Sequence, residues 1–288
     1  MTPQSPQQFG ICSWNTKPQS VDDLIRSLKA LGLAKVQLGF KPLREKPEAW
    51  ANVKQRLRDE GIEIVSGMLS TMGQDYSTLE SIRRTGGFVV DERWEENREW
   101  ARVNADVAAE LGLKNTLVHA GFVPEDHKSA QFAVLVERLQ VVTDFFGRNG
   151  LDLMLETGQE TPETLLAFIV AVGRPNLRVN YDGGNMVLYN TGDPNGSLRK
   201  LYPKLVEIHI KDALYTKTPG TWGTEVPIGE GVTDWKAFMT FLAQNDYRGN
   251  LVIEREAGQE RIADIRKAIT FLSEMMAASG DPALARQS

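Results

Sequence analysis

The feature that most constrains the fold is a regular alternation of short apolar runs and longer amphipathic stretches along the chain. Short runs rich in Val, Ile and Leu are typical of buried strands, whereas apolar residues spaced three and four apart are typical of helices. Runs such as "LDLML" and "LVEIHI" are apolar enough to be covered on both faces, as parallel strands are. Eight strands are predicted: Phe9–Trp14, Lys35–Leu38, Ile62–Met68, Thr116–Ala120, Leu151–Glu156, Leu177–Tyr181, Leu205–Ile210 and Asn250–Glu254.

Helices are predicted between these strands, and glycines mark where several of them end. Glycine after a helix is favoured because it adopts the left-handed backbone conformation without steric cost. Such glycines occur at positions 32, 61, 112, 150 and 173. The predicted helices are Val21–Leu31, Glu48–Arg58, Trp94–Leu111, Ala130–Arg148, Thr164–Val172, Asp234–Gln244 and Ile262–Met276, with a shorter one near Ser197–Leu201.

Eight strand–helix units predict a (β/α)8 TIM barrel of the α/β class. We expect a single domain over residues 1–288, with its core at 9–276 and a frayed tail at 281–288. Barrels of about 250 residues commonly form one domain, so a chain of 288 residues fits. The alternative is an open doubly wound sheet. Its dinucleotide-binding form would need a glycine-rich turn after the first strand, and the segment "CSWNTKPQS" has none.

Charge and cysteine content narrow the class of protein. The formal net charge is −5 and the isoelectric point is about 5.4, which fits an enzyme of small metabolites. Proteins that bind nucleic acid usually carry a basic surface, so no nucleic-acid partner is expected. Cys12 is the single cysteine, which excludes an intramolecular disulfide. The polar start of the chain and the absence of a run of 18 apolar residues predict neither a signal peptide nor a membrane span, and hence a cytoplasmic protein.

Ionisable residues lie where the last four predicted strands end. They are Glu156, Asp182, His209 and Glu254, and in a barrel such positions face the active-site mouth. Each carboxylate could instead belong to a surface salt bridge, and His209 could be a core histidine. Four consecutive strands favour one site. Three crowded carboxylates repel one another, and a divalent cation removes that conflict. The oxygen and nitrogen donors suit Mn²⁺, Mg²⁺ or Co²⁺, and Zn²⁺ also fits.

Several short motifs occur in order along residues 9–275: "LET", "NYDGGNM", "HIKDA", "PIGEGVTDW" and "VIERE". Together they resemble the xylose isomerase-like sugar phosphate isomerase/epimerase superfamily, which includes ketose 3-epimerases, inosose isomerases and dehydratases, and apurinic endonucleases. By that resemblance the same four residues match the metal ligands of the family. Lys211 matches the lysine of its H-x-K-D motif, and Glu230 lies in its G-E-G loop.

The sequence departs from the ketose 3-epimerases at three positions. Asn185 stands where they have a histidine three residues after the metal aspartate, and Tyr215 stands where they have an arginine. Pro162 replaces a second glutamate, and Glu160 is the nearest acid. The resemblance therefore implies the barrel and its metal, but not a free ketose as substrate.

The resemblance implies a metal-dependent isomerase or epimerase that acts on a keto-sugar, an inosose or a related sugar derivative through an enediolate. Its cofactor would be one divalent ion and its partner a small sugar; relatives are often dimers or tetramers, so a homo-oligomer is compatible. Glu156 and Glu254 would be the acid/base pair. His119, on the fourth strand, is predicted to bind substrate or to be structural. The predicted substrate-binding residues are His119, Lys211, Asn185, Glu230 and Trp14.

Three other functions are weighed against this one. A lyase, such as an inosose dehydratase or a keto-glycoside eliminase, would use the same site and share the first proton transfer. An apurinic endonuclease would bind three metals through many histidines, whereas this chain has three histidines in all. A non-catalytic sugar-binding barrel would have no chemical reason to bring costly carboxylates together.

Overall fold

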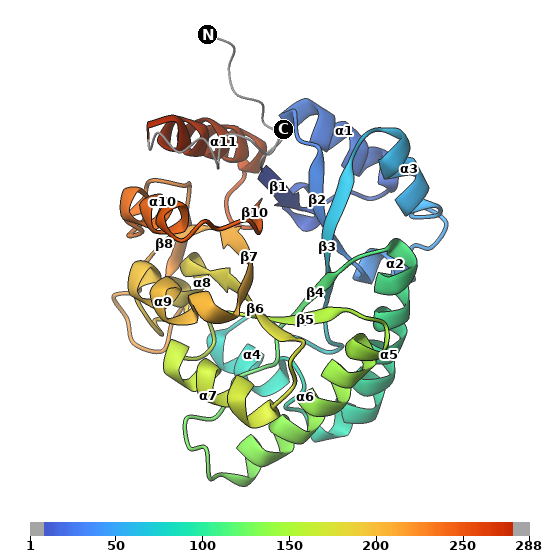
Figure 1. Cartoon of the computed structure of the whole chain (residues 1–288), viewed down its shortest axis with the longest axis vertical. Coiled ribbons are helices and arrows are strands. Elements are labelled where there is room, and N and C mark those ends of the chain that lie inside the picture. The colour runs from blue at the N-terminus through green and yellow to red at the C-terminus, as the bar shows by residue number, and fades with distance from the viewer. Residues whose placement is uncertain (1–8, 279–288) are drawn as a thin grey trace.

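Eight parallel strands form a closed barrel in the computed structural model, which describes residues 9–278 (Figure 1). Around the barrel the order is β1-β10-β7-β6-β5-β4-β3-β2. The predicted (β/α)8 TIM barrel is therefore confirmed. The tail expected at 281–288 lies outside the described residues. The barrel strands are β1 (Phe9–Cys12), β2 (Lys35–Gly39), β3 (Glu63–Leu69), β4 (Asn115–Val118), β5 (Asp152–Glu156), β6 (Leu177–Asp182), β7 (Leu205–Ile210) and β10 (Asn250–Ile253).

Helices surround the barrel (Figure 1). They are α1 (Val21–Leu31), α2 (Lys41–Glu45), α3 (Val53–Asp59), α4 (Leu79–Thr85), α5 (Trp94–Leu111), α6 (Ala130–Arg148), α7 (Pro162–Val172), α8 (Gly183–Leu188), α9 (Pro194–Leu201), α10 (Trp235–Gln244) and α11 (Arg261–Ala278). The predicted helix Glu48–Arg58 begins too early, because its first residues form a turn and α3 starts at Val53. No described helix combines the length and the apolar character needed to cross a membrane.

Local capping sets the ends of the outer helices. The side chains of Ser20, Ser129 and Thr161 each accept a hydrogen bond from the backbone N–H three residues later, at the starts of α1, α6 and α7. These bonds satisfy donors that the first turn of a helix leaves free. Gly32 and Gly112 end α1 and α5 with positive φ angles of 68° and 79°. Short side chains thus fix the starts of α1, α6 and α7, and glycines fix the ends of α1 and α5.

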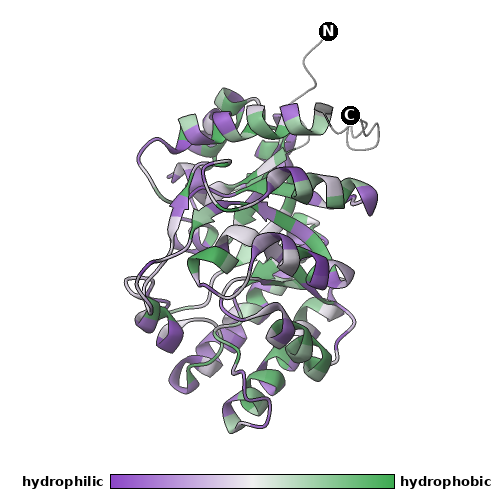
Figure 2. Ribbon diagram, turned by 90° about the vertical axis from the view of Figure 1, so that its left-hand side faces the viewer, coloured by the Kyte–Doolittle hydropathy of each residue, from purple (hydrophilic) through white to green (hydrophobic). Residues whose placement is uncertain are grey.

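Hydrophobic and hydrophilic residues alternate along the outer helices (Figure 2). Most of the buried hydrophobic residues of the strands and helices form one core cluster. The barrel interior also contains polar side chains. Gln37, Ser66 and Glu207 are each 0% exposed. Burying such groups is costly unless they are hydrogen-bonded, so their arrangement bears on the site above them.

A small hairpin extends from β7 beside the barrel mouth. Strands β8 (Asp212–Leu214) and β9 (Thr224–Val226) pair in antiparallel fashion, apart from the barrel sheet. The hairpin contacts α8, and it carries Trp222 and Glu225 to the wall of the cavity above the strands. This cavity is where the C-terminal ends of the strands meet.

Candidate metal centre

Four adjacent barrel strands bring the predicted ligands together. Glu156 ends β5, Asp182 ends β6, His209 lies in β7 and Glu254 follows β10. One ligand atom from each of these residues lies within 4.8 Å of all the others, and all four side chains are buried. The cluster predicted from the strand ends is therefore present as a single group.

The imidazole of His209 lies at the centre of this group. Its Nδ1 atom is 3.0 Å from Glu156 Oε1, 3.2 Å from Glu254 Oε2 and 3.8 Å from Asp182 Oδ2. Its Nε2 atom is 2.9 Å from Gln37 Oε1. Because an amide oxygen only accepts hydrogen bonds, Nε2 carries a proton. In a neutral imidazole, Nδ1 is then an acceptor, and it faces carboxylate oxygens that are also acceptors. This arrangement is favourable only if a cation or an added proton lies between them.

The charge of the group supports a cation. Three carboxylates converge here. Lys211 is paired with two of them: its Nζ atom is 2.7 Å from Glu254 Oε2 and 3.3 Å from Asp182 Oδ2. Asp182 Oδ2 is buried and accepts no hydrogen bond. Burial raises the pKa of Asp182 to about 6, although Lys211 opposes the shift. The donor set of three carboxylates and one imidazole nitrogen fits one divalent cation of the Mn²⁺, Mg²⁺ or Co²⁺ type.

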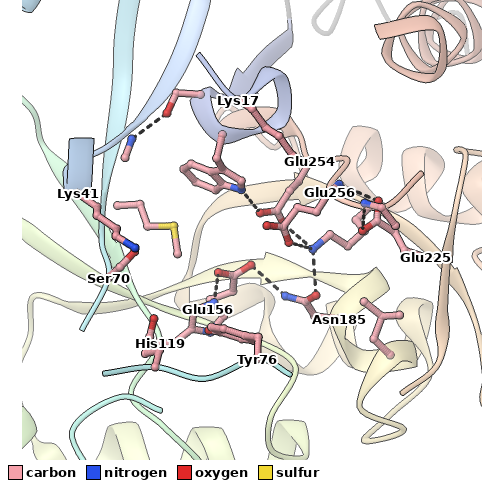
Figure 3. Close-up of a pocket in the computed structure, with 18 of the residues that line it drawn as sticks. Lys17, Lys41, Ser70, Tyr76, His119, Glu156, Asn185, Glu225, Glu254 and Glu256 are labelled. Carbon is pink, nitrogen blue, oxygen red and sulfur yellow. Dashed lines mark hydrogen bonds and ion pairs between the residues drawn. The ribbon is translucent and has the colours of Figure 1, made fainter. Parts of the chain in front are cut away.

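Two further contacts orient the glutamates (Figure 3). His119 Nε2 lies 3.0 Å from Glu156 Oε2, and the indole N–H of Trp14 donates to Glu254 Oε1 at 2.8 Å. Burial opposes ionisation of Glu156, but His119 and His209 outweigh it and lower the pKa of the carboxyl to about 2. Each glutamate is therefore held from the side by a ring nitrogen, while its other oxygen faces the cluster.

The predicted substrate-binding residues divide into two groups. His119, Lys211, Asn185 and Trp14 line the same cavity as the glutamates, and Lys211 donates to Asn185 Oδ1 at 3.1 Å. Asn185 in turn donates to Glu156 Oε1 at 3.0 Å. Glu230 does not join them, since it is exposed and is not among the residues that line the cavity.

The loop that contains Glu230 instead folds around Asp212. The backbone N–H groups of Gly229 and Gly231 donate to Asp212 Oδ2 at 3.0 Å, and the indole of Trp235 donates to the same atom at 2.9 Å. A Cβ atom on Gly231 would lie 2.0 Å from Asp212 Oδ1, so the loop needs glycine there. The motif "PIGEGVTDW" thus has a structural basis in its backbone and its tryptophan.

Several cavity residues were not identified from the sequence. Tyr76 and Tyr189 supply aromatic walls to a cavity of about 700 Å³, beside Trp14 and Trp222, and Glu256 adds a further carboxyl. Glu256 Oε2 lies 3.6 Å from Lys211 Nζ. Its position two residues after Glu254 was the available signal. Tyr76 lies in an irregular segment and Tyr189 in the turn that follows α8, where no periodic pattern indicates the direction of a side chain.

Comparisons with known proteins agree with the barrel fold. The family model described as "Xylose isomerase-like TIM barrel" matches residues 25–275. A xylose isomerase domain protein from Planctomyces limnophilus is 30% identical, with a TM-score of 0.84 over 97% of this chain and 99% of that one. The uncharacterized protein YihM of Escherichia coli K12 is 26% identical over 145 residues, which cover 49% of this chain and 44% of YihM. The match therefore spans less than half the length of that relative.

More distant structures share the fold alone. The 3-keto-D-glucoside 4-epimerase YcjR from E. coli has a TM-score of 0.66 at 17% identity, covering 95% of this chain and 99% of that one. An L-ribulose 3-epimerase and a probable 3-DHS dehydratase from Bacillus anthracis, at 16% and 17% identity, also share it. Because the family model covers most of the sequence, this chain belongs to the xylose isomerase-like TIM barrel family.

Proposed function

We propose that the protein is a divalent-metal-dependent isomerase or epimerase of a keto-sugar, an inosose or a related sugar derivative. The observation that carries the proposal is the pair Glu156 and Glu254. These carboxylates end different strands, line one cavity and belong to the same cation-binding group (Figure 3). The related structures include sugar epimerases, which supports the same class of reaction.

Glu156, Asp182, His209 and Glu254 would hold the ion. When bound, a divalent cation stabilises negative charge on substrate oxygens and so makes a C–H bond next to a carbonyl more acidic. The chain's own contribution is to hold these donors in a buried, nearly closed group, since each is at most 4% exposed.

The two glutamates would move the proton. Epimerisation needs one group to remove a proton from a carbon and another to return a proton to the opposite face. Glu156 and Glu254 come from β5 and β10, which lie on either side of β6 and β7 in the barrel order, so they can flank a substrate above the cluster. Lys211 and His119 would donate hydrogen bonds to substrate oxygens.

The aromatic walls would bind the sugar and exclude water. Trp14, Tyr189 and Trp222 line the cavity, and the rings of Tyr189 and Trp222 pack edge to face at 4.7 Å. Apolar walls with a few convergent polar groups are typical of small-molecule sites. The cavity of about 700 Å³ accommodates a sugar or a sugar derivative.

A lyase is the second candidate, and Glu256 is the observation that favours it. Elimination shares the proton removal but also needs an acid for the leaving group. Glu256 lines the cavity close to Lys211 and could take that part. Its substitution by Gln should then stop elimination while leaving proton removal intact.

The test is solvent deuterium exchange in D₂O with Mn²⁺, followed by NMR over a panel of keto-sugars, inososes and 3-keto-glycosides. We expect the wild type to form an isomeric product whose mass differs from that of the substrate only by the incorporated deuterium. Glu156→Gln and Glu254→Gln should exchange deuterium at least about 100-fold more slowly. Metal content is measured on each variant, because both residues are also proposed ligands. Full exchange by both metal-loaded variants would contradict the assignment. Loss of water or an alcohol from the product would indicate the lyase.

A further inference from the structure

A network of buried polar side chains lies beneath the metal centre and takes no part in the proposed proton transfer. It consists of Gln37 in β2, Ser66 in β3 and Glu207 in β7, all fully buried inside the barrel. Barrel interiors are usually filled by branched apolar side chains, and a buried carboxyl without a task is costly. We therefore expect this buried polar network to have a function other than filling the core.

In this buried polar network the hydrogen bonds are directed toward Glu207, which accepts them. Glu207 Oε1 accepts from the amide nitrogen of Gln37 and from Ser66 Oγ, the latter at 2.7 Å. The Gln37 amide nitrogen also donates to Ser66 Oγ at 2.9 Å. The other oxygen of Glu207 accepts from Asn250 Nδ2 at 3.2 Å. Every contact of Glu207 with these neighbours is thus one in which the carboxylate accepts.

This direction fixes which end of the Gln37 amide faces His209. If the amide were rotated, its oxygen would face the carboxylate of Glu207, and both groups would be acceptors. The Gln37 oxygen is therefore held 2.9 Å from His209 Nε2, where it accepts the ring proton. The remaining nitrogen, Nδ1, is left unprotonated and faces the three carboxylates.

We infer that Gln37 and Glu207 are positioning residues that hold His209 with its proton on Nε2 and with Nδ1 directed at the cation. Partners of this kind commonly set the orientation of a ligating histidine, and their loss typically weakens metal binding 10- to 100-fold. The inference rests on the proposed function, because it requires a cation at the four-residue cluster. Neither residue touches the substrate cavity, so both act through His209 alone.

The test is a calorimetric titration of the metal-free full-length protein with Mn²⁺. Glu207→Gln frees the Gln37 amide to rotate, and Gln37→Met removes the acceptor while keeping a similar volume. We expect each variant to bind Mn²⁺ about 10- to 100-fold more weakly. The double variant Gln37→Glu with Glu207→Gln exchanges the two groups. The new carboxylate at position 37 then accepts from His209, and the new amide at position 207 donates to it, so affinity should return to within a few-fold of wild type.

Cys12→Ala is the matched control, because Cys12 Sγ lies 3.7 Å from both His209 Nε2 and Gln37 Oε1. A thiol is only a weak donor and acceptor, so its loss leaves the bond between Gln37 and His209 in place. Its Mn²⁺ affinity should stay within about twofold. A second measurement is ¹⁵N NMR of histidine in the Mg²⁺-loaded protein, which contains three histidines. The Nε2–H proton of His209 should exchange slowly with solvent in wild type and in the double variant, and faster in the single variants. Thermal unfolding of each metal-free variant confirms that it folds.

The outcomes separate the two proposals. If wild type binds one Mn²⁺ and both single variants bind it equally well, or if the double variant does not recover, the positioning role is wrong while the metal centre stands. If wild type binds no Mn²⁺ at the cluster, the proposed function itself fails, and the inference fails with it.

Discussion

Two aspartates, Asp182 and Asp212, are both buried, yet their side chains have opposite hydrogen-bonding environments. Asp212 accepts hydrogen bonds from four backbone N–H groups and one indole, at residues 213, 229, 231, 233 and 235. The side chain of Asp182 accepts one hydrogen bond, from the backbone N–H of Asn185. Its other oxygen accepts none from the described residues and is paired with the Lys211 ammonium at 3.3 Å, although two more carboxylates lie beside it. Hydrogen-bond donors of the protein itself therefore satisfy Asp212, whereas the cluster around Asp182 is the one that we propose binds a cation.

This difference separates structure from function within a few residues of sequence. His209 and Asp212 belong to the same motif, "HIKDA", but only the first of them joins the cluster. A carboxylate surrounded by donors stabilises the fold. A set of carboxylates that face one another is unfavourable for the metal-free fold and becomes favourable with a cation. The predictions below follow from this contrast.

The largest effect on stability is expected at Asp212. Asp212→Ala removes the shared acceptor of five donors, some of which would stay buried without a partner, so the free energy of unfolding should fall by about 3–4 kcal/mol. Urea unfolding measures it. Asp234→Ala is the control on the same loop, because it removes a single helix cap and should cost about 1 kcal/mol. If both variants lost the same free energy of unfolding, Asp212 would be no more important for stability than an ordinary helix cap.

At Asp182 the expectation is reversed. Asp182→Asn keeps the oxygen that accepts from Asn185 but removes a charged donor from the cluster. Mn²⁺ affinity should fall at least about 100-fold, which is about 3 kcal/mol. The metal-free protein should be as stable as wild type or more stable, because burial raises the pKa of Asp182 to about 6 and so disfavours its charge. Calorimetry and urea unfolding test both statements; strong destabilisation with unchanged affinity would reverse the roles of the two aspartates.

Cation binding should stabilise the fold by a somewhat smaller amount. At a free Mn²⁺ concentration 100 times the Kd, the gain is about 2.7 kcal/mol if the unfolded chain does not bind the ion. We expect the Tm of wild type to rise with Mn²⁺ and to fall again with EDTA. Asp182→Asn, with its affinity lowered at least about 100-fold, should gain no more than about 0.4 kcal/mol at the same concentration. A Tm that ignores Mn²⁺ in the wild type would contradict a folded-state site.

The smallest effect sharpens the contrast with a third buried carboxyl. Glu160 is 8% exposed, and burial raises its pKa to about 8 while His119 opposes the shift. The folded state therefore keeps the proton that the unfolded chain loses near pH 4.5, and this residue's contribution to stability falls as pH rises from about 5 to 8. Glu160→Gln removes that contribution. Between about pH 6 and 7.5 the difference between variant and wild type should grow by about 2 kcal/mol, whereas parallel curves would show that Glu160 is ionised in the fold.

Much of the fold is predictable from sequence because its elements are long or strongly periodic. The bounds of α1, α5 and α6 agree with the predicted ranges. The helices α4 and α8 and the hairpin β8–β9 were missed, since they are short and have no pattern of their own. Their positions depend on neighbours: α8, for example, is capped by Asp182, a residue of the cluster.

The site residues also divide into those that the sequence predicts and those that it does not. Glu156, Asp182, His209 and Glu254 are found from sequence because strand ends fix where their side chains meet. Gln37 and Glu207 could not be found, because their contact joins β2 to β7 across the barrel and depends on which side chains meet inside. For Glu230 the resemblance indicated a substrate contact, but the contacts of its loop are made by the backbone of Gly229 and Gly231, which donate to Asp212.

The most direct test of the central claim is an anomalous difference map from crystals of the protein soaked in Mn²⁺. We predict one strong peak in contact with carboxylate oxygens of Glu156, Asp182 and Glu254 and with Nδ1 of His209. No peak at this position in crystals grown and soaked near neutral pH, or a peak bound through Nε2 of His209 and Cys12 instead, would contradict the account.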